Sequence, residues 1–332
     1  MDLLKRYVLP RLLQWLVVVF TGVTVTFIIP RLLPTDPVQV TLNRMQSREL
    51  TDPRAMASLR SALEDLYGLK GTLFEQYIAY WRRLLQGDLG PSLGSFPTPV
   101  IVIIRNGMPW TVGLLTCTAV ISWLLGIVLG TLAGCSPGKM WSQVLDKVLV
   151  TLMPIPYPIF ALVLVIVFCY YVPIFPMVGG AFGKPSFSWS YIRSLLKHGF
   201  LPGLSLVLGG TAFRFIMAKA LASTVLSSDY VSYARMAGVP RRDIVFKYVV
   251  RNTLLPQITD LGLGLGAMFS GALITEMLFA YPGIGYSLYT AILQADFNLM
   301  LAVTLFSIIG IATAALLIDL SYPLFDPRVR YR

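Results

Sequence analysis

The chain has 332 residues, of which 56% are hydrophobic and only 13% are charged, and its mean hydropathy is +0.71. Soluble globular proteins usually carry about one quarter charged residues, so this composition excludes an ordinary soluble domain and favours an integral membrane protein. The formal net charge of +11 does not point to nucleic acid as a partner, because many of the basic residues flank apolar segments, as in cytoplasmic loops.

Apolar segments long enough to cross a bilayer recur along the chain. A helix needs about 20 apolar residues to span the hydrocarbon core, and the uncharged stretch 12–30 is longer than the core of a usual signal peptide, so we predict a retained first span. The PIPYP sequence at 154–158 indicates either a flexible point or an irregular helix start in the third span. We predict an all-α polytopic membrane protein with six transmembrane helices, at about residues 9–30, 108–134, 147–172, 200–220, 257–279 and 299–321.

The placement of basic residues predicts the orientation of these spans. Lysines and arginines occur in both terminal segments and in the loops 135–147 and 225–256, which the positive-inside rule places in the cytoplasm. The 281–298 loop has no lysine or arginine and is predicted to be external. Residues 31–105 are predicted to form a long external loop, and both termini are predicted to be cytoplasmic.

The external loop carries the signals of two helices. Pro53 suits the first position of one helix, and Gly68 suits its end. The TLFE sequence at 72–75 has the spacing of a capping box, and Gly87 is placed to end the second helix. We therefore predict that the loop between the first two spans is partly helical.

Charges and small residues inside the spans predict packing and function. Ionisable residues within a membrane mark functional pathways by default. For Arg214, which interrupts the fourth span, we favour snorkelling toward the membrane surface. For Glu276, which interrupts the fifth, a functional and a structural role are weighted equally. Glycines at 126, 130 and 134 form a doubled GxxxG pattern, which predicts close packing within the chain rather than a dimer face.

The sequence lacks the motifs of catalysis and nucleotide binding. No G-x-x-x-x-G-K-[ST], HExxH or GxSxG sequence occurs. Three cysteines without CxxC spacing, and a single histidine, do not support a metal site. The chain is therefore predicted to be neither an enzyme nor the holder of a cofactor. Any energy-driven step must draw on another subunit or on an ion gradient.

The long basic segment 225–256 reads as two short helices that meet at a glycine. Tyr230, Tyr233, Ala234 and Ala237 fall at the spacing of one apolar helix face. Gly238 suits the C′ position that ends this helix, and Pro240 suits the first position of the next helix. The apolar and basic surface of the pair would either lie on lipid headgroups or dock into a groove of a partner.

Four stretches resemble the dipeptide/oligopeptide-type permease subunits of ABC importers. YARMAG at 233–238 and LLP at 254–256 are similar to the EAA loop of that family, although the glutamate of the strict motif is absent. GDLGPS with PWTVGLL is similar to the region that enters the second span. TEMLFAYPGIGYSLYTAILQAD is similar to the segment between the fifth and sixth spans, and YPLFDPRVRYR to the C-terminus. The resemblance covers nearly the whole chain in order.

The resemblance implies one transmembrane permease domain over residues 1–332, with the type I ABC importer (MetI-like) fold, in a prokaryotic plasma (inner) membrane. Expected partners are a second homologous permease subunit, two cytoplasmic ABC ATPases that bind ATP and Mg, an external substrate-binding protein and the lipid bilayer. The 225–256 segment would be the coupling loop that docks on one ATPase. The residues assigned to this coupling are Tyr230, Tyr233, Ala234, Arg235, Ala237, Gly238, Arg241 and Pro256. A pathway or gate role is expected of Glu276, Tyr281, Pro282 and Gly283.

The substrate is less well defined by the sequence. Di- and oligopeptides are predicted ahead of oligosaccharides, although FPMVGGAFG at 175–183 and SLYTAILQADF at 287–297 look like the oligosaccharide branch. Nickel chelates are least favoured, because no histidine and cysteine cluster lines the spans. Three other classes stay open. An ion-coupled secondary transporter usually has mid-span carboxylates and an internal repeat, a membrane enzyme needs a catalytic constellation, and the basic loop alone would allow a scaffold.

Overall fold

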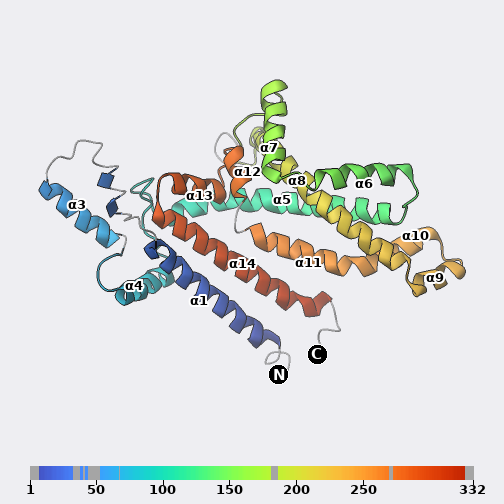
Figure 1. Ribbon diagram of the computed structural model, residues 1–332, viewed down its shortest axis with the longest axis horizontal. Coiled ribbons are helices and arrows are strands. Elements are labelled where there is room, and N and C mark those ends of the chain that lie inside the picture. The colour runs from blue at the N-terminus through green and yellow to red at the C-terminus, as the bar shows by residue number, and fades with distance from the viewer. Residues whose placement is uncertain are drawn as a thin grey trace. The chain divides into compact units, whose positions relative to one another are not determined.

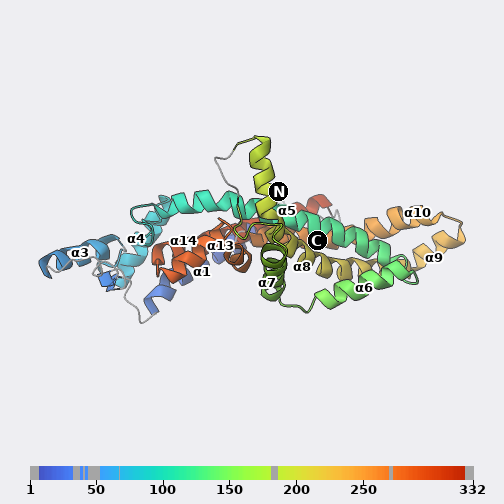
Figure 2. The same cartoon turned by 90° about the horizontal axis from the view of Figure 1, so that it is seen from above.

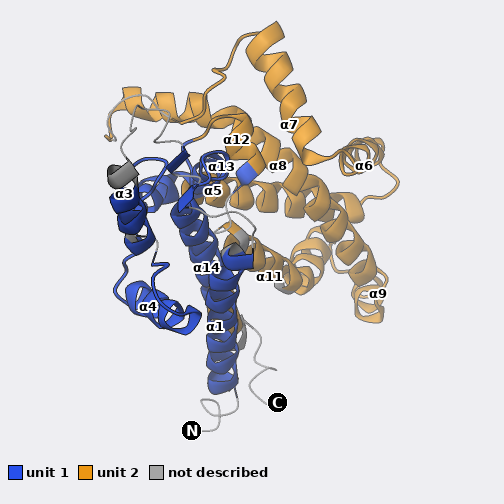
Figure 3. Ribbon diagram, turned by 60° about the vertical axis from the view of Figure 1, so that its left-hand side comes forward, with its two compact units in different colours: residues 1–111, 269–273, 282–313 blue, residues 112–268, 274–281, 314–332 orange. Residues whose placement is uncertain are grey.

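The computed structural model describes residues 7–32, 38–39, 42–43, 53–66, 68–180, 186–268 and 272–325. Regular structure in these ranges is helical apart from one isolated antiparallel bridge between Pro91 and Pro99, which confirms the predicted all-α class. The chain divides into two compact units (Figure 3). Unit 1 comprises residues 1–111, 269–273 and 282–313, and unit 2 comprises residues 112–268, 274–281 and 314–332.

The helices are labelled along the chain in Figure 1, and Figure 2 shows them from above. They are α1 (Leu9–Leu32), α3 (Pro53–Leu66), α4 (Leu73–Leu85), α5 (Val100–Gly134), α6 (Met140–Leu152), α7 (Tyr157–Val165), α8 (Trp189–Leu226), α9 (Asp229–Met236), α10 (Arg241–Asp243), α11 (Arg251–Ala267), α12 (Leu273–Leu278), α13 (Ile284–Leu293) and α14 (Phe297–Phe325). Two π-helical segments, η2 (Ile166–Tyr171) and η3 (Ile244–Val250), continue α7 and α10.

Four helices in the described ranges are long and apolar enough to cross a membrane: α1, α5, α8 and α14. They match the predicted first, second, fourth and sixth spans. However, α8 has 38 residues and extends past both ends of the predicted 200–220 span. The predicted fifth span, 257–279, falls on the 17-residue α11 and on α12, with residues 269–271 outside the described ranges. Six spans therefore remain a prediction, and the helices account for four or five.

The predicted third span, 147–172, falls on two helices that meet at a sharp bend. Its first part is α6 and its second part is α7 with η2, and the two are bent by 101° at the break. The break holds Pro154 and Pro156, which lack the N–H that an α-helix needs and clash with the preceding turn. The irregular helix start that PIPYP indicated is thus what the structure shows. The phenol oxygen of Tyr157, at the start of α7, lies 2.8 Å from Ser205 Oγ on α8 and 2.5 Å from Thr275 Oγ1 on α12.

In unit 1, the predicted external helices have the expected ends. α3 begins at Pro53, and Gly68 follows it with a φ of +65°. Thr72 and Glu75 form the predicted capping box at the start of α4. Gly87 ends α4 with a φ of +73°, and its N–H donates to the carbonyl of Leu84. The start of α5 packs against α13 and α14 through one buried cluster, formed by Val100, Ile104, Ala291, Leu299, Ala302 and Val303.

A buried carboxylate ties the segment before α5 to the start of α14 in unit 1. Asp296 has no exposed surface. Its Oδ2 accepts hydrogen bonds from Ser92 Oγ at 2.5 Å and from the backbone N–H of Gly94 at 3.0 Å, and its Oδ1 caps α14 through the N–H of Leu299 at 3.1 Å. Three donors on one carboxylate offset the free energy of burying it.

Asp296→Ala should therefore destabilise unit 1 by about 2–4 kcal/mol, because it leaves buried donors without an acceptor and removes a helix cap. Asp296→Asn keeps one acceptor oxygen in the side chain, so its loss of unfolding free energy should be smaller. The measurement is the thermal unfolding midpoint of each variant in detergent. Equal midpoints for Asp296→Ala and the parent would contradict the role assigned to this carboxylate.

In unit 2, the doubled GxxxG pattern of α5 packs against α8, which confirms the predicted packing within the chain. A Cβ atom at position 130 would lie 2.8 Å from the Cβ of Ala218, and one at position 134 would lie 2.9 Å from the Cβ of Ala222. Such distances leave no room for a side chain. Both glycines therefore allow close approach of the two backbones, as membrane helix pairs require.

Candidate functional site

The segment predicted to couple to a partner forms two short helices at one end of unit 2. Figures 1 and 2 both place α9 and α10 beyond the ends of α5 and α8. Ala237 is the C-cap of α9 and Gly238 occupies C′ with a φ of +78°. The N–H of Gly238 donates to the carbonyl of Arg235 and the N–H of Val239 to the carbonyl of Ala234, both at 3.0 Å. These two bonds form a Schellman motif, and they confirm the C′ position predicted for Gly238.

The apolar face predicted for α9 is divided between two environments. Ala234 is buried with Val231 against the rest of unit 2, whereas Tyr230, Tyr233 and Ala237 are exposed. Tyr233 has 68% of its surface exposed and Met236 has 74%, so the tip of α9 presents apolar side chains that nothing in the described chain covers. The spacing did not separate the two faces, because Tyr230 and Tyr233 lie on the outer side of the helix while Ala234 lies on its inner side.

The second short helix, α10, begins after Pro240 and is anchored by Arg241. Pro240 is the N-cap of α10, with a ψ of 145°, so the prediction of the first helical position is wrong by one residue. Arg241 Nη2 donates to the carbonyl of Cys135 at 2.7 Å and to Ser136 Oγ at 3.0 Å, which ties α10 to the loop after α5. Burial raises the pKa of the Cys135 thiol. Arg235 is exposed at the tip.

Pro256 and the residues of the predicted gate belong to other elements than the α9–α10 tip. Pro256 is inside α11. Glu276 in α12 has no exposed surface, and 5% of Tyr281 is exposed. The N–H of Tyr281 donates to the carbonyl of Glu276 at 2.8 Å. In unit 1, Gly283 caps the N-terminus of α13 directly after Pro282. A pathway role for these four residues stays a prediction.

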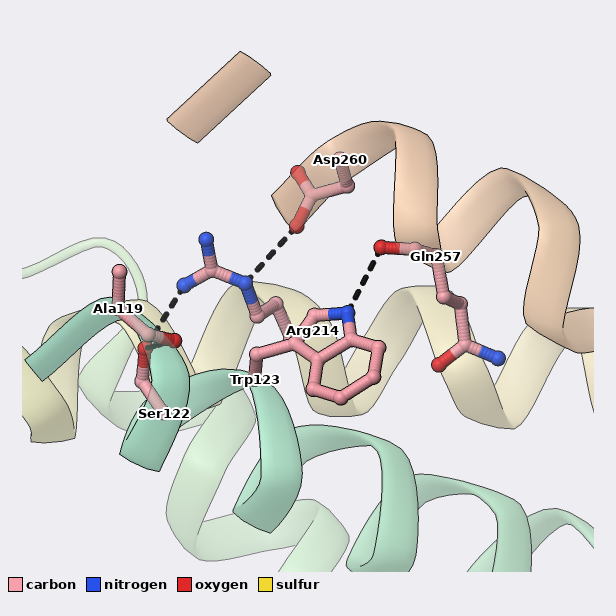
Figure 4. A network of polar contacts seen from close by, with 6 residues as sticks. All are labelled: Ala119, Ser122, Trp123, Arg214, Gln257 and Asp260. Atoms are coloured by element: carbon pink, nitrogen blue, oxygen red, sulfur yellow. Dashed lines mark hydrogen bonds and ion pairs between the residues drawn. The ribbon is translucent and has the colours of Figure 1, made fainter. Parts of the chain in front are cut away.

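A second polar cluster, which the spacing did not reveal, lies between α5, α8 and α11 in unit 2 (Figure 4). Arg214 Nε on α8 donates to Asp260 Oδ2 on α11 at 2.8 Å, and Arg214 Nη1 donates to Ser122 Oγ on α5 at 2.9 Å. Close by, Trp123 Nε1 donates to the backbone carbonyl of Gln257 at 2.7 Å. The exposed fraction is 14% for the Arg214 side chain and 25% for that of Asp260.

The snorkelling predicted for Arg214 is wrong. Arg214 lies 12 residues before Leu226, the end of α8, which is about 18 Å at 1.5 Å per residue. A Cβ atom at position 210, one turn farther from that end, would lie 2.9 Å from Arg214 Nη1. The guanidinium therefore points away from the nearer end of the helix and toward its ion-pair partner.

The signal that would have found this pair was an opposite charge in the next span. Taken singly, Asp260 and Arg214 each lie only a few residues from the end of a predicted span. Each therefore looked like a residue at the membrane interface. Two opposite charges in consecutive apolar spans have a better alternative in lipid, because pairing removes two uncompensated charges at once. Glycine at 210 and at 264 leaves the room that the guanidinium needs between the helices.

Across the described ranges no group of three or more histidine, cysteine, aspartate or glutamate residues is placed to hold a metal ion. The α9–α10 tip exposes apolar and basic side chains, and the Arg214–Asp260 ion pair places two opposite charges between neighbouring helices.

Comparison with known proteins gives one consistent result. A family model described as "Binding-protein-dependent transport system inner membrane component" matches residues 126–331. The oligopeptide transport system permease protein AppB of Bacillus subtilis is 26% identical over 99% of this chain and 100% of its own length. The probable D,D-dipeptide transport system permease protein DdpB of Escherichia coli is 30% identical over 95% and 94%. The di/tripeptide transport system permease protein DppB of Pseudomonas aeruginosa is 30% identical over 97% and 98%.

Proposed function

This chain belongs to the family of binding-protein-dependent transport system inner membrane components, and we propose that it forms half of the translocation pathway of an ATP-driven importer of di- and oligopeptides. The observation that carries the substrate class is the full-length similarity to permeases named for oligopeptides, dipeptides and tripeptides. Family membership makes the chain a transport component of the inner membrane rather than an enzyme. The second half of the pathway would be a homologous permease subunit.

The α9–α10 tip supports the proposed contact with an ATPase. A docking element must present a rigid surface at the end of the bundle, and the Schellman motif together with the Arg241 anchor fixes this tip. The exposed Tyr233 and Met236 are apolar side chains that a groove in a partner would cover. ATP and Mg would be bound by two such ATPases on the cytoplasmic side, and an external binding protein would deliver the substrate.

Uptake by the complete complex tests this function. The permease would be co-purified with its genetically adjacent partners, reconstituted in proteoliposomes, and supplied with binding protein and either alanine di- to tetrapeptides or maltooligosaccharides. We expect ATP-dependent accumulation of the peptides, and no ATP hydrolysis by this chain alone. Accumulation of oligosaccharides with exclusion of peptides would replace the substrate class and leave the transport class intact.

Membrane orientation gives a separate prediction. Both termini and residues 225–256 are proposed to be cytoplasmic, and residues 31–105 external. The test uses a cysteine-free parent in cells whose outer envelope is permeabilised and whose plasma membrane is intact. Ser61→Cys on α3 should react with a membrane-impermeant thiol reagent, and Ser232→Cys on α9 should not. Both side chains are exposed in the chain itself, so a difference in labelling reports sidedness. Labelling of position 232 under these conditions would mean that the orientation is the opposite of the one proposed.

A further inference from the structure

Asp260 has one carboxylate oxygen that the ion pair does not use. Its Oδ2 accepts from Arg214, and among the described residues no donor is bonded to Oδ1. A carboxylate has acceptor capacity for several hydrogen bonds, so the single bond to Arg214 leaves it incompletely satisfied. Arg214 is the more enclosed partner, with 14% of its side chain exposed against 25% for Asp260. The more exposed side chain of the pair is therefore that of Asp260.

The open side of Asp260 cannot be directed at lipid. Charged groups within membrane spans face the interior of a helix bundle or a water-filled cavity, because hydrocarbon cannot solvate them. Part of the Asp260 side chain is exposed in this chain, so either water or another molecule must solvate its carboxylate. In a permease that forms half of a pathway, the water-filled space is the pathway itself.

We propose that Asp260 is a substrate-contacting residue in the translocation pathway, where it receives the free α-amino group of the passing peptide. This role rests on the proposed function. The ammonium group is the one cation that every unmodified short peptide carries, whatever its side chains. Arg214 is the positioning residue, because it holds the carboxylate and balances its charge, and Ser122 fixes the guanidinium in turn. The pair thus offers a carboxylate without adding net charge to the membrane interior.

The glycines around the pair support a site built for a held guanidinium. A Cβ at position 264 would lie 3.2 Å from Arg214 Nη2, and one at position 210 would lie 3.0 Å from Ser122 Oγ. The absence of a side chain at both positions therefore leaves room for the Arg214 guanidinium between the helices.

A neutral double variant separates substrate contact from a purely structural role. Arg214→Gln/Asp260→Asn keeps two polar side chains of similar size and leaves no unpaired charge, so the complex should assemble. We expect uptake of alanine di- to tetrapeptides to fall about tenfold, the loss expected for one charge-assisted hydrogen bond, while basal ATP hydrolysis is unchanged. Leu263→Ala, an exposed position on the same helix, is the matched control and should transport normally.

The outcomes are distinct. If the parent complex takes up none of the peptides, the proposed function fails and this role fails with it. If the parent takes them up and the double variant does so at the parental rate, only the role of Asp260 is refuted. Should this double variant not assemble, Arg214→Leu/Asp260→Cys in an otherwise cysteine-free parent, which also leaves no unpaired guanidinium, decides the question. A charged thiol reagent should modify it in the intact complex, and saturating peptide-loaded binding protein with ATP should slow that reaction. No modification would mean that the second permease covers this position, which would overturn the proposal.

Discussion

Gly238→Glu and Ala237→Asp should each abolish most substrate uptake while leaving the amount of protein in the membrane unchanged. Gly238 has a φ of +78°, and a side chain in this left-handed conformation costs about 1–2 kcal/mol. A Cβ at this position would meet no atom of the chain within 4 Å, so the strain and the added side chain act at the tip rather than in the core. Ala237→Asp adds a charge to the exposed surface that we expect a partner to desolvate.

The measurement is peptide uptake and ATP hydrolysis in the reconstituted complex, together with recovery of the ATPases on purification of the tagged permease. We expect uptake to fall at least tenfold, with hydrolysis either reduced or no longer tied to substrate delivery. Ser61→Ala on α3 is the control, since it lies in the other unit and should change neither quantity. Normal uptake in both tip variants would mean that residues 225–256 are not the coupling element, and would favour a lipid-surface role for α9 and α10.

Local chemistry explains which parts of the fold were predictable. The ends of α3, α4 and α9 follow from glycine at a left-handed position or from a capping box, and both signals depend on residues within one turn. The doubled GxxxG pattern likewise predicts close packing, because only the absence of a side chain matters. Length and hydropathy were enough for α1, α5, α8 and α14.

The features that were missed depend on partners far apart in the sequence. The bend of 101° between α6 and α7 needs prolines, which were noted. However, Tyr157, directly after the break, contacts Ser205 and Thr275, which lie 48 and 118 residues away in the sequence. The contact between Asp296 and Ser92 joins residues 204 positions apart, and no periodic pattern reports it. The division of the α9 surface into a buried and an exposed side depends on which side of the helix the rest of unit 2 covers.

Arg214→Leu and Asp260→Leu should both destabilise the chain, and Asp260→Leu should be the more damaging. Each single change leaves one charge of a half-buried pair without its partner, for which the expected loss is about 1–3 kcal/mol. The two remaining charges are not equivalent. A carboxylate can take up a proton and become neutral, whereas a guanidinium stays charged under all ordinary conditions. Arg214 left alone therefore keeps its full desolvation penalty.

The double change Arg214→Leu/Asp260→Leu removes both charges and should be less destabilising than Asp260→Leu alone, because no uncompensated charge remains and leucine fits an apolar environment. Thermal unfolding midpoints of the four proteins, measured in the same lipid and detergent mixture, form a double-mutant cycle. We expect strong non-additivity, with the double variant above the Asp260→Leu variant. Additive losses would show that Arg214 and Asp260 do not interact, and would remove the basis for a carboxylate held in place by Arg214.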